Sequence, residues 1–155
     1  MIDMGYDTRQ ARQDLLDAVA DAIDDLARAL AALGVAYEQR DEHHADELAE
    51  MLFGPIQSAY GRARRTHTEF ATRHGLPTRT FEAPVPGAPS TGAKGFVDDA
   101  VAAVGHADVT LATLQDSMLP IEVGDPELRA GLANVRELVD CVRRNAKALT
   151  RTIGR

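Results

Sequence analysis

Apolar residues near the C-terminal end of the chain recur in alternating steps of four and three, a spacing that fits only one regular structure. In an α-helix such residues share one face, which is then buried against a partner. Directly before them, Asp125-Pro126-Glu127 offers an N-cap, a proline at the first helical position and an acid in the first turn. We therefore predict a helix over residues 126–153, whose buried face consists of Leu128, Leu132, Val135, Val139, Val142, Ala146, Leu149 and Ile153.

The same spacing predicts a second helix over residues 93–119, which Pro120 ends. Its apolar positions are Phe96, Ala100, Val104, Ala107, Leu111, Leu114 and Met118. Residues 75–92 precede it and hold prolines at 77, 84, 86 and 89 together with Ser, Thr and Gly. That composition predicts an irregular, Pro-rich connection, long enough to run the length of a helix bundle.

The first 74 residues are also helical in pattern, and their division rests on two glycines. Leu15, Val19, Ile23, Leu26, Leu30 and Leu33 form one apolar stripe. Gly34 followed by Val35 fits a Schellman ending, which predicts helices over residues 8–33 and 36–74, the second kinked near Pro55. The alternative is a first helix over residues 8–52 with the break at Gly54.

No segment alternates apolar and polar residues as a strand does, so we predict an all-α protein. The four helices are expected to form one domain over residues 1–155, an antiparallel up-down-up-down bundle. Charge alternates from acidic to basic along residues 1–50, 51–80, 81–127 and 128–155. We expect the aspartates of the first helix to face the basic ends of the second and fourth helices and so to fix which helices are neighbours.

Composition excludes several function classes. No window holds 18 consecutive apolar residues, so no membrane-spanning segment is predicted. The start lacks the basic-then-apolar order of a signal peptide and Cys141 is the only cysteine, which makes the cytoplasm the expected location. A net charge of −7 argues against nucleic acid as a partner, although the basic residues 143–155 offer an alternative footprint.

Chemistry-bearing residues are few and scattered. His43 and Glu47 are one helical turn apart, a spacing that metal ligands use, and His67 and His74 both fall on the apolar stripe of the second predicted helix. Di-metal bundles need Glu-x-x-His on two helices, and this motif does not occur. We expect no catalytic residue, no cofactor and no metal, and we keep a metal or small-ligand site at these four residues as the alternative.

Tyr37-Glu38-Gln39-Arg40-Asp41 has the Tyr-x-x-x-Asp spacing that resembles the export signal of type VII secretion substrates. That resemblance implies a helical protein linked to type VII secretion. Such substrates also carry a Trp-x-Gly turn, whereas this chain has no Trp. The expected function is a non-enzymatic interaction or scaffold protein that binds a protein partner or itself; the ligand-binding bundle and the secretion-linked protein are the alternatives.

Overall fold

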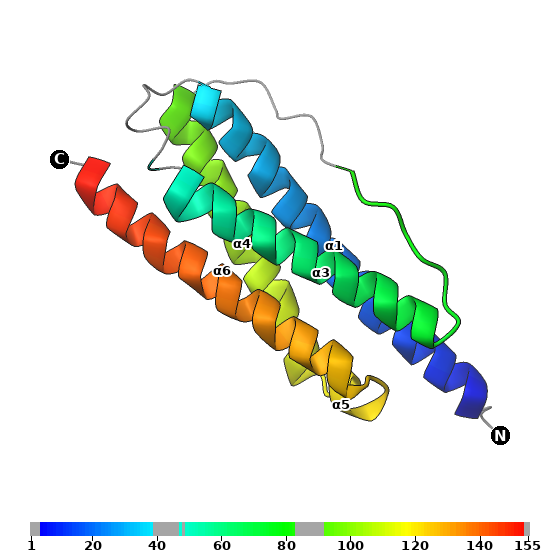
Figure 1. The fold of residues 1–155 in the computed structure, drawn as a ribbon. Helices are drawn as coiled ribbons and strands as arrows, with labels where there is room; N and C mark the ends of the chain where they lie inside the picture. The colour runs from blue at the N-terminus through cyan, green and yellow to red at the C-terminus, as the bar shows by residue number, and fades with distance from the viewer. Residues whose placement is uncertain (1–3, 39–46, 48, 83–91, 154–155) are drawn as a thin grey trace.

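Four long helices run side by side in the computed structural model, which describes residues 4–38, 47, 49–82 and 92–153 (Figure 1). They are α1 (Met4–Glu38), α3 (Gly54–Arg73), α4 (Gly92–Asp116) and α6 (Pro126–Ile153). A π-helical turn, η1 (Ala49–Phe53), precedes α3, and the short α5 (Leu119–Glu122) follows α4. Every regular element in these ranges is helical, which confirms the predicted all-α class. None of the described helices combines the length and apolar character needed to cross a membrane.

The helices form a ring of four contacts around one aliphatic core. α1 packs along α4 and α3 packs along α6, while α1–α3 and α4–α6 contacts close the ring. Fully buried side chains from each helix meet inside, among them Leu26, Phe70, Leu111 and Leu132. Since aromatic residues make up only 5% of the chain, this core is built mainly from Leu, Val and Ala.

The direction of α4 differs from the predicted up-down-up-down order. Arg9 donates to the carbonyl of Gly75 and Arg12 to that of Val123, so the start of α1 meets the end of α3 and the α5–α6 corner. Because α5 directly follows α4, the end of α4 lies at this same end (Figure 1). The observed order is therefore up, down, down, up, and each helix is antiparallel to both of its neighbours.

The long connection explains this order. Residues 74–91 can span about 3.3 Å each, whereas a helix rises about 1.5 Å per residue. The chain therefore has the reach to return along α3 before α4 begins. Its first part lies against the bundle: Leu76 and Phe81 are buried, and Arg79 pairs with Asp24 of α1 at 3.0 Å. Pro84, Pro86 and Pro89 lie outside the described residues.

The predicted break at Gly34 is wrong, because α1 continues through it to Glu38. Ala36 is fully buried and Val35 packs on the core, so burial beyond the glycine outweighs the roughly 1 kcal/mol that Gly costs inside a helix. The alternative helix over residues 8–52 falls partly on residues 39–46 and 48, which lie outside the described residues; in the described part, residues 49–53 are π-helical.

The predicted kink near Pro55 coincides with a π-helical turn, because η1 runs directly into α3 and Phe53 has helical backbone angles. Pro55 lies in the first turn of α3, where its missing N–H leaves no hydrogen bond broken within that helix. In a continuous α-helix its N–H would bond the carbonyl of Met51. Asn145 of α6 donates to that carbonyl instead, at 2.8 Å. A side chain from another helix thus satisfies the acceptor that proline leaves over.

The other boundaries shift less. α4 ends at Asp116, before the predicted residue 119, because Met118 adopts a left-handed conformation and Pro120 opens α5. α6 spans the same residues as the predicted last helix, and Asp125 accepts a hydrogen bond from the N–H of Leu128 as its cap.

The predicted charge pairing between the first and last helices is not observed. α1 and α6 lie diagonally opposite in the ring, so their charges are too far apart to select neighbours. No ion pair between described residues joins α1 to α3 or α6. Instead α1 contacts α4 through Asp25 and His106, and α4 contacts α6 through Asp108 with Arg136 and Arg143.

Candidate functional site on the α4 surface

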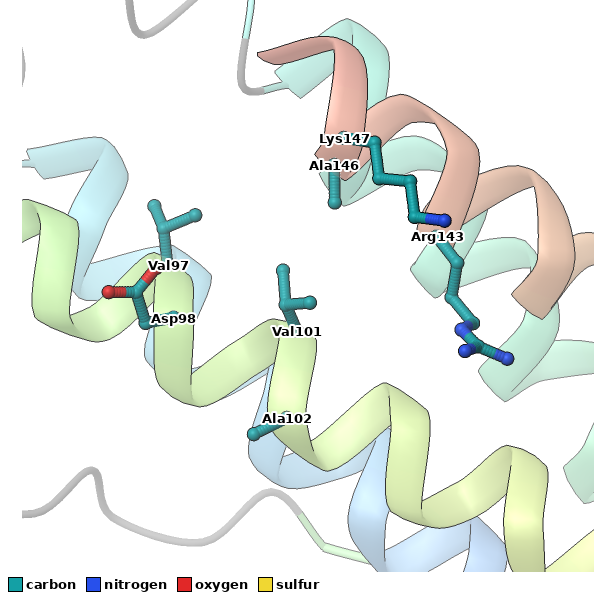
Figure 2. A pocket seen from close by; sticks show the side chains of 7 residues that line it. All are labelled: Val97, Asp98, Val101, Ala102, Arg143, Ala146 and Lys147. Carbon is teal, nitrogen blue, oxygen red and sulfur yellow. The ribbon is translucent and has the colours of Figure 1, made fainter. Parts of the chain in front are cut away.

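α4 and α6 diverge toward the start of α4 and leave a groove of about 590 Å³ between them. Val97 and Val101 project from α4 across the gap toward Ala146 of α6 (Figure 2). Arg143 and Lys147 line the α6 side, while Asp98 and Ala102 line the α4 side. The groove therefore combines an aliphatic floor with a basic wall on α6 and one carboxylate, that of Asp98, on α4.

The two cations of this wall are held differently. The Arg143 guanidinium lies 3.0 Å from Asp108, a carboxylate that Arg136 also contacts at 3.1 Å. Lys147 has no carboxylate partner in the described part of the chain, and its side chain is exposed. Among the described residues, Lys147 is consequently the groove cation whose charge no carboxylate balances.

A second polar feature lies on the other flank of α4, facing α1. The Asp25 side chain is only 2% exposed, and its Oδ2 lies 2.5 Å from Nδ1 of His106, whose side chain is 68% exposed. Arg28, one turn along α1, forms an ion pair with the other oxygen of Asp25. A buried carboxylate is thus held between an arginine and an exposed histidine.

Small residues on α1 make this contact between helices feasible. Asp25 lies between Ala22 and Ala29 on one face of α1, and both alanines are fully buried. Alanine lets α4 approach closely, so the short Asp25 side chain reaches the ring of His106. Because a buried charge is costly unless it is paired, Asp25 requires both of its partners.

This arrangement fixes which ring nitrogen carries the proton when the imidazole is neutral. An ionised carboxylate only accepts hydrogen bonds, so the neutral ring donates from Nδ1 and carries its lone pair on Nε2. Arg28 already supplies the positive charge that balances Asp25. No hydrogen bond within the described part of the chain engages Nε2. In its neutral form, His106 therefore presents the lone pair of Nε2 on a side chain that is largely exposed.

The histidines predicted as alternative ligands do not come together at a site. His67 is buried, its ring packs edge-on against Phe81 at 5.2 Å between centroids, and its Nδ1 has no hydrogen-bond partner in the described structure. Burial lowers the pKa of His67 below its ordinary 6.5, and the charge of Arg79 lowers it further. The neutral form is therefore favoured, as suits a core position.

His74 has a structural partner instead. Its Nε2 lies 2.9 Å from Asp125, which Arg73 also binds through two hydrogen bonds of 2.8 and 2.9 Å. Burial acts to raise the pKa of Asp125, but the bonds from Arg73, from the N–H of Leu128 and from His74 outweigh it and hold that pKa far below its usual range. This cluster ties the end of α3 to the start of α6.

The remaining predicted residues are His43, Glu47 and those of the Tyr-x-x-x-Asp segment. His43 is outside the described residues, whereas Glu47 is described and half-buried. Within the described ranges, no three His, Cys, Asp or Glu side chains gather closely enough to hold a metal ion. Tyr37 of the Tyr-x-x-x-Asp segment is exposed in the last turn of α1, and Asp41 is outside the described residues.

Sequence reasoning found no partner for His106, because the partner is 81 residues away. One signal was present: Asp25 interrupts the run of small residues Ala18, Ala22, Ala29, Ala32 and Ala36 on one face of α1. An acid in a stripe of alanines at helical spacing must be buried with a partner on the neighbouring helix. The stripe alone does not say which helix that is.

Comparison with known proteins gave no match. No family model fits the sequence, no curated protein aligns with it significantly, and no solved structure superposes on it significantly. The functional argument therefore rests on the residues of this chain.

Proposed function

We propose that this protein is a helical-bundle interaction module that receives an acidic, amphipathic helix of a partner protein in the groove between α4 and α6. One observation supports the proposal: Val97, Val101 and Ala146 form an apolar floor beside Lys147, a cation with no carboxylate partner among the described residues. Helix-in-groove recognition uses this combination, with apolar anchors for affinity and charge for orientation.

The shape of the groove favours a helix over a small molecule. Small-molecule sites enclose most of their ligand, whereas this groove lies open along the surface between two helices. A third helix laid on α4 and α6 would bury its aliphatic side chains on the valines. Its acidic edge would then face Lys147 and the outer part of Arg143.

A synthetic peptide provides the test. Because the chain contains no Trp, one Trp in the peptide gives a fluorescence signal free of background. The peptide is a helix with Leu at steps of three and four and Glu along one edge. A second peptide carries Lys in place of every Glu. We expect the acidic peptide to bind and the basic one to bind at least about tenfold more weakly, since like charges would then meet at Lys147.

Two variants locate the binding. Val101→Glu places a carboxylate on the apolar floor, where it would repel the acidic peptide, and should abolish its binding. Ala130→Glu places the same side chain on an exposed position of α6 that does not line the groove and should leave binding unchanged. Equal affinity for both peptides, or binding unaffected by Val101→Glu, would refute the proposal.

A further inference from the structure

His106 suggests an activity that does not depend on the groove. We propose that His106 is a phosphoryl acceptor, with Nε2 as the nucleophile and Asp25 as its positioning residue. The phosphoryl donor is an acyl phosphate or a phosphoramidate, two classes whose leaving groups depart readily. The observation behind it is the pair described above: a buried carboxylate, balanced by Arg28, that fixes the exposed ring of His106.

The transfer step is chemically balanced. The Nε2 lone pair attacks phosphorus and a P–N bond forms. The bond from phosphorus to the leaving group breaks, and its electron pair departs with the carboxylate or the amine. Nδ1 keeps its proton, so the ring gains a positive charge that faces the Asp25 carboxylate at 2.5 Å. A neighbouring carboxylate stabilises such an imidazolium, as in other carboxylate–histidine pairs.

The surroundings of His106 favour phosphoryl transfer over other histidine chemistry. Acyl transfer needs N–H donors for an oxyanion, but His106 lies inside α4, where backbone N–H groups are used by the helix. Metal binding needs further ligands, and none gather here within the described ranges. Phosphoryl transfer depends mainly on position and charge, and Arg28, 58% exposed beside the pair, offers a guanidinium to a phosphoryl group.

The open position of His106 fits a donor that is itself a protein. Val109 lies one turn beyond His106 on α4 and is 63% exposed. Ala102, one turn before, is also exposed. Neither residue covers the ring, so a donor domain can approach Nε2 along this face of α4.

The test uses the full-length chain and phosphoramidate as the small donor. Phosphorylation is located by peptide mass spectrometry under alkaline conditions, which preserve the P–N bond, and ³¹P NMR distinguishes Nε2 from Nδ1 adducts. We expect His106 to be labelled on Nε2 at least about tenfold faster than histidines of the same chain unfolded in urea, by analogy with the effect of orienting partners on metal-binding histidines. This labelling would appear as a fast kinetic phase, and His106→Gln should remove it.

Matched variants separate positioning from folding. His74→Gln should leave the fast phase intact, because Nε2 of His74 already contacts Asp125. Asp25→Asn should slow labelling at least about tenfold while circular dichroism still shows the bundle. Should that variant fail to fold, ¹⁵N NMR of the wild type still tests the idea: the proposal requires the Nδ1–H tautomer at His106. An Nε2–H tautomer, labelling on Nδ1, or a rate equal to that of the unfolded chain would overturn it.

Discussion

α6 has two neighbours and meets them in opposite ways. Against α3 it packs so closely that a Cβ on Gly131 would overlap the Thr66 side chain, and Asp125 and Asn145 secure the two ends of the contact. Against α4 it diverges and leaves the groove at Val101 and Lys147. One amphipathic helix thus makes a closed contact and an open one, and the difference lies in single residues rather than in its apolar stripe.

The largest expected effect comes from Gly131→Ala. The new Cβ would overlap Oγ1 of Thr66 and lie 2.8 Å from its Cγ2, so α3 and α6 must separate. We expect urea denaturation to show a loss of about 1–3 kcal/mol, even though alanine is the better helix former. Adding Thr66→Ala should restore part of the loss.

Gly105→Ala is the matched change on α4, because its Cβ would meet nothing within 4 Å. It should raise the free energy of unfolding by about 0.5–1 kcal/mol. If both glycine variants changed the free energy of unfolding in the same direction, the distinction between the closed α3–α6 contact and the open α4–α6 contact would be contradicted.

The second largest loss of stability is expected where the end of α3 meets the start of α6, at Asp125. Asp125→Ala removes the cap of α6 and the partner of Arg73 and His74, which should cost about 2 kcal/mol at pH 7. Asp125→Asn keeps a capping oxygen and should cost less, as chemical denaturation of both variants would show.

The same aspartate predicts a pH dependence with a definite sign. Its pKa is lowered in the fold, so the unfolded chain takes up the proton first as pH falls. The wild type should exceed Asp125→Ala in free energy of unfolding by the full amount above about pH 4, and this difference should shrink below that pH. An advantage that grows on acidification would contradict this role.

His67 on α3 provides a smaller test. Because burial lowers the pKa of His67, protonation on acidification favours the unfolded chain, and the stability of the wild type should fall as pH drops below the ordinary value of 6.5. His67→Leu removes the unpartnered Nδ1 along with the Phe81 contact, so at pH 7 the change should stay within about 1 kcal/mol. Thermal melts at pH 5 and 7 should show a weaker pH dependence in the variant.

The smallest effect on stability is expected on the open side. The triple variant replaces Arg143, Arg144 and Lys147 with Glu. It removes one ion pair between helices, that of Arg143 with Asp108, while Arg136 still binds this aspartate. Because exposed ion pairs contribute little, the free energy of unfolding obtained from thermal melts should change by less than about 1 kcal/mol. The same variant should no longer bind the acidic peptide, so its effect on partner binding can be separated from its effect on folding.

Local sequence signals predicted elements better than they predicted how those elements end. Asp125-Pro126 placed the start of α6 because a cap and a proline act within one turn. The prediction at Gly34 is wrong because the cost of a glycine is local, whereas the burial of Ala36 that outweighs it comes from other helices. The predicted charge pairing fails too, because the partner of an ion depends on which helices are neighbours.

The candidate site was out of reach for the same reason. The sequence shows Val97 and Lys147 only as one apolar and one basic position on separate helices, and it shows Asp25 and His106 as unrelated residues. A groove exists only where two helices diverge, and the histidine gains its orientation only when α1 packs against α4.

Periodicity and composition by themselves determined that this chain is helical and which face of each helix is buried, because both follow from contacts within a few turns. Only the tertiary structure decided the direction of α4, the partner of Asp25 and the gap beside Lys147. These depend on how the connection returns and on how closely two helices approach. Both are set by packing between residues far apart in the chain, which no local pattern records.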